Sequence, residues 1–336
     1  MPSMDVFNAD AFSMNSLTRA VNHEPYVPGF LGNLGLFEVE PVATETVQVE
    51  NRSNVLSLIP TSPRGSAPTT RTEEKRNLRN VSTVRIAKDD PIYASQIQNL
   101  RAFGSESELA TVQGEWARRT SRLMRDVELT WENMRLGAVQ GIVTDADGST
   151  IIDWYDFWGV SQPGEIDFEL DDATTDVRGK CSTVVRAMAR AAGGSFLPTT
   201  RVYGLAGDTF WDDLVKHAMV RETYLYQQGA QLREQSAFGM LDFAGITFVN
   251  YRGTDDASTV AISTSKCKFF PVGAIDMFGV AFSPGESFDV VNTMGLPLYN
   301  MMVRDLDRNM WVKSEVYSYP LFLAYKPLCL QRAKNA

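Results

Sequence analysis

The sequence has little of what an active site or a disulfide framework requires. Its 336 residues include only two histidines, His23 and His217, and three widely spaced cysteines, Cys181, Cys267 and Cys329, with no CxxC pair. An odd number of dispersed cysteines predicts reduced, buried thiols rather than disulfides or a zinc site. The sequence lacks a phosphate-binding GxxxxGK[ST] loop and the GxGxxG, GxSxG and HExxH motifs. We therefore expect no catalytic residues, no cofactor and no bound metal.

Excess basic charge and long apolar runs are also missing. The net charge of −9 argues against a nucleic-acid binder that neutralises phosphates. No stretch approaches the roughly 18 apolar residues of a membrane helix, and the N-terminus lacks the pattern of a signal peptide. With 44% hydrophobic residues, the chain can build a sizeable core in one large or two ordinary domains.

The longest regular pattern predicts a helix over residues 105–141. Ser105 followed by Glu108 is a capping box, and Gly141 supplies the end of the helix. Such a helix is roughly 54 Å long at 1.5 Å per residue. The apolar stripe recurs at three-, four- or seven-residue steps and consists of Leu109, Val112, Trp116, Leu123, Val127, Thr130, Met134 and Ala138.

The hundred residues before this helix contain no comparable core-forming pattern, and the first forty of them are the most irregular. A short helix is predicted around Asn15–Val21, and apolar residues then alternate with Gly and Pro. This composition suits an extended arm that packs on another surface, with a plain domain-entry loop as the alternative. The apolar contact candidates are Phe30, Leu31, Leu36 and Phe37.

Residues 41–90 predict a two-stranded projection. Strands are expected at Thr46–Glu50 and Asn54–Ile59 around a polar turn, and a Pro-, Ser- and Thr-rich loop follows at residues 61–72. The chain returns through Arg79–Ala87. Because an isolated two-stranded ribbon is marginal in water, it needs a partner surface.

Two charge runs of opposite sign stand out. Between Ser62 and Lys88 only Glu73 and Glu74 oppose the basic residues Arg64, Arg71, Lys75, Arg76, Arg79, Arg85 and Lys88. Between Leu136 and Val177 there is no Lys or Arg, and the carboxylates are Asp145, Asp147, Asp153, Asp156, Glu165, Asp167, Glu169, Asp171, Asp172 and Asp176. The two runs are either solvated faces or complementary surfaces of different copies.

The rest of the sequence mixes helices and strands without βαβ alternation, which indicates the α+β class. A hairpin is expected at Ile142–Thr144 and Thr150–Asp153 through an Asp-Gly turn, and helices at Asp176–Ala192 and Asp208–Arg221. The expected strands are Arg201–Gly204, Gly245–Tyr251, Thr259–Ser263, Lys266–Phe270, Lys313–Tyr317 and Phe322–Tyr325.

The acidic run is the only candidate for chemistry. Asp145-Ala-Asp147-Gly148 resembles the start of a calcium loop, but Asp156 replaces the glutamate at the twelfth position and the glycine comes too early. A metal-dependent hydrolase that uses the Asp145–Asp176 carboxylates stays open as an alternative function, although a solvated or interface face fits this density of charge better.

Several segments, in order along nearly the whole chain, resemble the lambda-type major capsid protein family of tailed bacteriophages, also called major capsid protein E. The most specific is the end of the long helix, Arg135-x-Gly137-Ala138-Val139-x-Gly141, which runs into Asp145-Ala-Asp147-Gly148. The others are Ala11-Phe12-Ser13-Met14-Asn15-Ser16-Leu17-Thr18, Pro28-Gly29-x-Leu31-Gly32, Gly35-Leu36-Phe37, Pro60-Thr61-x-Pro63-Arg64-Gly65, Arg101-Ala102-Phe103-Gly104, Gly207-Asp208-x-Phe210-Trp211-Asp212-x-Leu214-Val215-x-His217 and Pro320-Leu321…Lys326-Pro327.

The resemblance implies the Hong Kong phage-type capsid fold. It implies an N-terminal arm at residues 1–40, an extended loop at 41–90, a peripheral domain at 91–176 with the spine helix 105–141, an axial domain at 177–309, and C-terminal strands at 310–336 that return to the peripheral domain. The expected partners are further copies in hexameric and pentameric capsomers, portal, scaffold and decoration proteins, and enclosed double-stranded DNA bound without sequence specificity. No membrane is expected as a partner.

The same resemblance implies location in the virion, and in the host cytoplasm during assembly. Inter-subunit contacts are expected at the four apolar arm residues and at Arg64, Lys75, Arg76 and Arg79. A nanocompartment shell of the same fold, enclosing protein cargo, remains an alternative.

Overall fold

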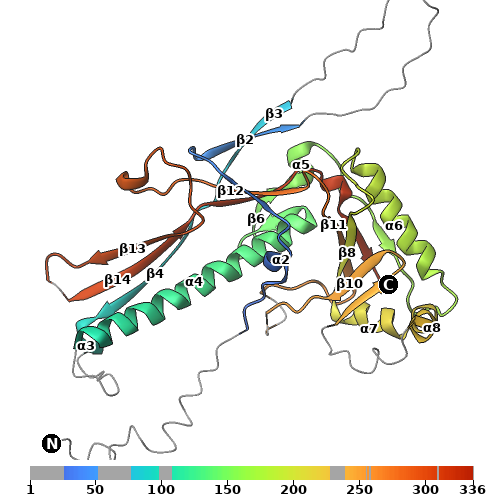
Figure 1. Cartoon of the computed structure of the whole chain (residues 1–336), viewed down its shortest axis with the longest axis horizontal. Coiled ribbons are helices and arrows are strands. Elements are labelled where there is room, and N and C mark those ends of the chain that lie inside the picture. The colour runs from blue at the N-terminus through green and yellow to red at the C-terminus, as the bar shows by residue number, and fades with distance from the viewer. Residues whose placement is uncertain are drawn as a thin grey trace, which may run out of the picture.

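The computed structural model describes residues 26–51, 77–97, 108–227, 239–254, 256, 259–308 and 310–335. Helices and strands are mixed, and two regions meet at a central junction: an extended one along helix α4 and a compact one around a six-stranded sheet (Figure 1). The predicted helix at Asn15–Val21, the strand at Asn54–Ile59, the loop at residues 61–72 and the capping residue Ser105 lie outside the described residues. No helix within the described ranges is both long and apolar enough to cross a membrane.

Helix α4 (Glu108–Gln140) is the spine of the extended region, and its 33 residues confirm the long helix predicted from the sequence. It ends where expected, because Gly141 has a φ of 84° and lies so close to Tyr155 that a Cβ would collide with the ring. Along α4 packs an antiparallel sheet in the order β13-β14-β4. Its strands are β13 (Tyr299–Arg304), β14 (Trp311–Ser318) and β4 (Ile86–Tyr93), followed by the short helix α3 (Ala94–Ile97).

The compact region is a mixed sheet in the order β7-β16-β11-β8-β10-β9. Helices α6 (Val177–Ala191), α7 (Asp208–Lys216) and α8 (Ala218–Gln227) pack around a core that includes Phe168, Phe210, Phe248 and Phe269. The strands are β7 (Glu165–Asp167), β16 (Gln331–Lys334), β11 (Lys266–Val272), β8 (Arg201–Ala206), β10 (Ile246–Asn250) and β9 (Met240–Phe243).

The junction holds the largest buried cluster. It combines the end of α4, the sheet β1-β12-β15, the hairpin β5–β6 and the short helices α2 and α5. The bounds are α2 (Phe30–Asn33), β1 (Glu38–Pro41), β12 (Phe278–Phe282), β15 (Pro320–Ala324), β5 (Ile142–Thr144), β6 (Thr150–Asp153), α5 (Trp154–Trp158) and the 3-10 turn η5 (Pro327–Cys329). From this junction the ribbon of β2 (Thr46–Asn51) and β3 (Asn77–Ser82) projects (Figure 1).

The structure corrects several local predictions. Thr46–Asn51 pairs with Asn77–Ser82, a pairing that the sequence did not predict, while the predicted partner Asn54–Ile59 lies outside the described residues. The helix predicted at Asp208–Arg221 is broken at His217, whose extended ψ of 134° separates α7 from α8, and its N-cap is Gly207 rather than Asp208. Thr259–Ser263 forms no strand.

Candidate assembly surfaces

The apolar arm residues lie largely against their own chain. Leu31 is 0% exposed, and the Phe37 ring lies 5.3 Å from the rings of both Phe278 and Phe322. Phe30 contacts Tyr251 edge to face, and Leu36 packs against the same junction core. The segment from Phe30 onward therefore contributes to the core of its own subunit, and Leu31 has no surface left for a neighbour.

A buried carboxylate on α4 fixes this segment. The side chain of Glu132 is 0% exposed, and it accepts hydrogen bonds from the backbone N–H of Leu31 at 2.8 Å and of Gly32 at 3.1 Å. The Tyr251 hydroxyl donates at 3.4 Å and Arg135 Nη1 at 3.3 Å. Burial and the nearby carboxylate raise the pKa of Tyr251, which keeps it a hydrogen-bond donor. Glu132 thus ties α2 to the spine helix.

Glu132 was not predicted from the sequence. Its position three residues before Arg135 is typical of an ordinary surface ion pair on a helix, and nothing local shows that α2, a hundred residues earlier, covers it. The signal is only that Glu132 adjoins the predicted buried stripe between Thr130 and Met134.

Among the basic contact candidates, the structure describes Arg79. Its guanidinium lies 5.6 Å from the centre of the Phe157 ring in α5, within the acidic run of its own chain. Val47 and Val49 of the ribbon are buried at the junction. Arg64, Lys75 and Arg76 lie outside the described residues, so their predicted contacts with another copy stay predictions.

Several carboxylates of the acidic run stabilise turns and helix ends. Asp145 and Asp147 accept backbone N–H bonds within the β5–β6 turn, and Asp153 and Asp176 cap α5 and α6. Hydrogen bonds from Ser149 and from Thr174 lower the pKa of Asp147 and of Asp172 respectively. In the described part of the chain no group of three or more His, Cys, Asp or Glu is placed to hold a metal ion.

A second charged cluster lies on the compact sheet, away from the acidic run's turns. Lys266 Nζ lies 2.8 Å from Glu165, and Lys334 Nζ lies 3.4 Å from Asp167. The hydrogen bond from Lys266 is the main cause that lowers the pKa of Glu165. These pairs join β7 to β11 and β16 across the sheet.

The three cysteines and His217 are buried. All three cysteines are free and buried, and burial raises the pKa of Cys181 to about 12 and of Cys329 to about 11. Thiols with such pKa values are protonated at neutral pH and unreactive. His217 Nε2 lies 3.1 Å from the carbonyl oxygen of Asp172, where it holds the break between α7 and α8 against the preceding loop.

The family of this chain follows from its similarity to known proteins. The family model described as phage major capsid protein E matches residues 13–335 of the chain. The chain belongs to this capsid protein family. Two relatives are similar over most of their length: the major capsid protein of Salmonella phage Felix O1 (isolate Felix O1-VT1), at 25% identity over 95% of both chains, and that of Pseudomonas phage KPP10, at 27% identity over 86% of this chain and 87% of the relative.

Solved structures share the fold at lower identity. A cyanophage A-1(L) capsid chain matches with a TM-score of 0.58 and 11% identity over 98% of this chain and 99% of that one. A putative capsid protein of an E. coli CFT073 prophage matches with a TM-score of 0.56 and 16% identity over 95% and 96%. The predicted α+β, Hong Kong phage-type capsid fold is therefore confirmed.

Family membership makes the chain a major capsid protein, with a structural and not an enzymatic role. It also implies assembly with further copies of itself into capsomers and a place in the virion. No observation supports the hydrolase or the nanocompartment shell that the sequence left open.

Proposed function

We propose that this chain is the shell subunit of an icosahedral tailed-phage head, in which hexamers and pentamers of copies enclose double-stranded DNA. The observation that carries the proposal is the family match over residues 13–335. Its acidic balance of −9 suits a wall that encloses DNA without competing for it. Portal, scaffold and decoration proteins are the further partners proposed, with assembly in the host cytoplasm.

The proposed organisation follows the elements that the structure describes. The ribbon β2–β3 lies in the proposed extended loop at residues 41–90, α4 in the peripheral domain at 91–176, and β8 to β11 of the six-stranded sheet in the axial domain at 177–309. Of the C-terminal strands at 310–336, β14 and β15 pack on α4, which supports their proposed return to the peripheral domain. Only the part of the proposed N-terminal arm that precedes Phe30 is proposed to contact other subunits, because residues from Phe30 onward pack on the core of their own chain. The basic segment with Arg64, Lys75 and Arg76 is proposed to meet carboxylates of a neighbouring copy.

Sedimentation and electron microscopy of the purified full-length protein, with and without its scaffold, test this function. We expect rings and closed shells at micromolar concentration. A globular 37.4 kDa monomer under every condition would contradict the proposal.

A further inference from the structure

The loop between β12 and β13 displays apolar side chains that the chain itself does not cover. In this crest loop (residues 284–296) Phe288 is 98% exposed, and Val291, Met294 and Leu296 are each more than half exposed. Single exposed apolar residues are ordinary, but four within nine residues form a patch. Such a patch on a folded loop marks a surface that another molecule covers.

The crest loop is held in shape by hydrogen bonds within the loop and to neighbouring segments of the same chain. The 3-10 turn η4 (Phe288–Val290) is capped by Ser287, whose Oγ accepts the N–H of Asp289 at 3.3 Å. Gly295 N donates to Val42 O at 2.9 Å, a close approach in which a Cβ would collide with the backbone of Phe282. Leu296 N donates to the Tyr299 hydroxyl at 2.8 Å. Because the loop is already ordered in the single subunit, binding of a partner costs little further conformational entropy.

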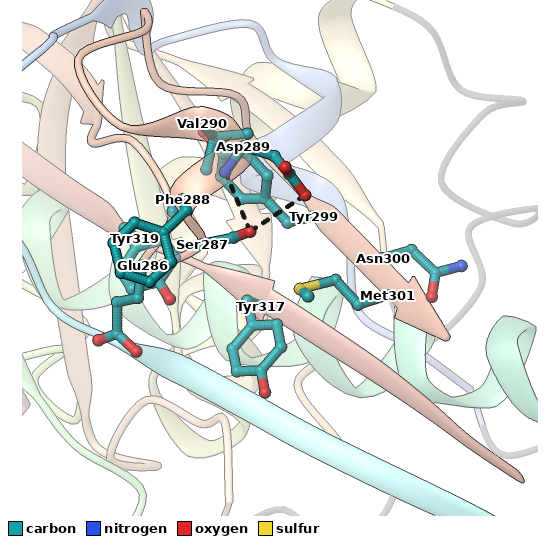
Figure 2. A pocket seen from close by; sticks show the side chains of 11 residues that line it. Glu286, Ser287, Phe288, Asp289, Val290, Tyr299, Asn300, Met301, Tyr317 and Tyr319 are labelled. Atoms are coloured by element: carbon teal, nitrogen blue, oxygen red, sulfur yellow. Dashed lines mark hydrogen bonds between the residues drawn. The ribbon is translucent and has the colours of Figure 1, made fainter. Parts of the chain in front are cut away.

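A recess lies directly beside Phe288. Figure 2 shows it between the crest loop and the strands β13 and β14. Its volume is about 600 Å³. The strand side is lined by Tyr299, Asn300, Met301, Tyr317 and Tyr319, and residues 285–290, which include the carboxylates Glu286 and Asp289, form the loop side. An apolar cavity of about 150 Å³ is enough to hold benzene. The recess can thus accept a phenylalanine ring with room to spare.

We propose that the crest loop pairs with the crest loop of a second copy across a two-fold axis, with each Phe288 entering the recess of the other. A protrusion and a recess that adjoin on one surface are what a two-fold contact requires, since each copy then gives and receives the same contact. An aromatic ring from a second copy also suits the three tyrosines and the methionine on the strand side of the recess. The pairing rests on the proposed assembly function.

The area of the patch fits this partner. The four exposed side chains present on the order of 500 Å² of mostly apolar surface, near the top of the range for the largest patch on a monomer. Two such patches together bury on the order of 1,000 Å², the lower bound of a specific protein–protein contact. A contact of this size is weak by itself. In a shell it adds to the other contacts that hold each copy in place.

Cross-linking of mixed single-cysteine variants tests the pairing. Full-length Phe288→Cys and Met301→Cys proteins are assembled as an equal mixture and oxidised mildly, and the particle and unassembled fractions are digested for mass spectrometry. Because each variant carries one of the two positions, a peptide linking 288 to 301 can come only from two copies. The three native cysteines are buried and give little background. We expect the 288–301 link in the particle fraction.

The outcomes separate the pairing from the assembly function. Particles without the 288–301 link, or absence of the link from both fractions, would overturn the pairing, whereas failure of the parent protein to form particles would overturn the proposed function. Phe288→Ser should weaken association between capsomers about 30-fold or more, as truncation of an interface hot spot does. Ile275→Ser, at an apolar residue that is 53% exposed and lies outside the crest loop, is the control and should assemble like the parent.

Discussion

The compact six-stranded region and the extended region along α4 bury their apolar side chains to very different degrees. Within the described residues the compact core joins nineteen buried residues, whereas the cluster between α4 and its three-stranded sheet has only Leu123, Val127 and Val316. Eight large apolar residues between 288 and 310 are exposed, in the crest loop, on β13 and in the turn before β14. The compact region therefore completes its own core, whereas the extended region leaves apolar surface exposed for neighbouring copies.

Truncation of one aromatic residue in each region should give the largest difference in stability. Phe269→Ala removes a fully buried ring that packs against Phe168 and Phe248, and should lower the free energy of unfolding by about 3–5 kcal/mol. Phe288→Ala should change it by less than about 0.5 kcal/mol, because the ring is exposed in the single subunit. Denaturant unfolding of unassembled protein measures both. Equal losses would contradict the contrast between the regions.

The junction between the regions depends on Glu132. Glu132→Ala leaves the buried N–H of Leu31 and the partly buried N–H of Gly32 without their acceptor and should cost about 1–3 kcal/mol in unfolding free energy. Amide hydrogen exchange should also accelerate at these two residues. Glu132→Gln keeps one acceptor oxygen and should cost less. Unchanged exchange in the alanine variant would show that the apolar contacts of Leu31 and Phe37 suffice to hold α2.

Charge reversal in the basic segment tests the proposed contacts between copies. Lys75→Glu with Arg76→Glu changes the local charge by four units, and should hinder assembly most at low salt, where charges interact over the longest distance. Each exposed pair contributes about 0–1 kcal/mol, so the effect comes from the sum. Arg79 stays unchanged because it contacts Phe157 of its own chain. Assembly equal to the parent in about 0.05 M salt would mean that apolar residues alone dock the ribbon.

The smallest expected effect is a pH dependence of the compact region. The pKa of Glu165 is lowered in the folded state, so its stabilisation is present above the unfolded pKa of about 4.3 and is lost as the pH falls through the folded value. Because the pair is partly exposed, the loss is on the order of 1 kcal/mol or less. Unfolding free energies between about pH 5 and 3 should fall less steeply in Glu165→Gln than in the parent. Parallel curves would show that the pair with Lys266 is not stabilising.

The sequence predicted the elements whose signals are local. Helix α4 follows from its apolar stripe and Gly141, the β5–β6 hairpin from its Asp-Gly turn, and α6 from Asp176 at its N-cap. Short strands such as β1 and β7 were missed, because parallel pairing with β12 and β16 defines them and leaves no alternating pattern. The pairing of β2 with β3 was not predicted either, since pairing between strands that are far apart in the sequence leaves no local signal.

The candidate surfaces were predicted less well than the fold. The arm residues Phe30, Leu31 and Phe37 were selected because they are apolar on a Gly- and Pro-rich segment, but their own core accounts for their packing. Glu132 and Phe288 were missed because burial of the one and exposure of the other arise from tertiary packing. Residue type alone does not distinguish an apolar side chain that is buried in its own core from one that is exposed until another copy covers it.

Oxidative labelling of methionines tests the central claim most directly, namely that copies of the chain cover the exposed apolar surface of the extended region. Met294, Met301, Met302 and Met310 report on that surface, and the similarly exposed Met240 of the compact region serves as the reference. We predict that shells protect the four methionines relative to subunits released from the same shells, while labelling of Met240 changes little. Equal oxidation of the four in shells and in released subunits would contradict the account.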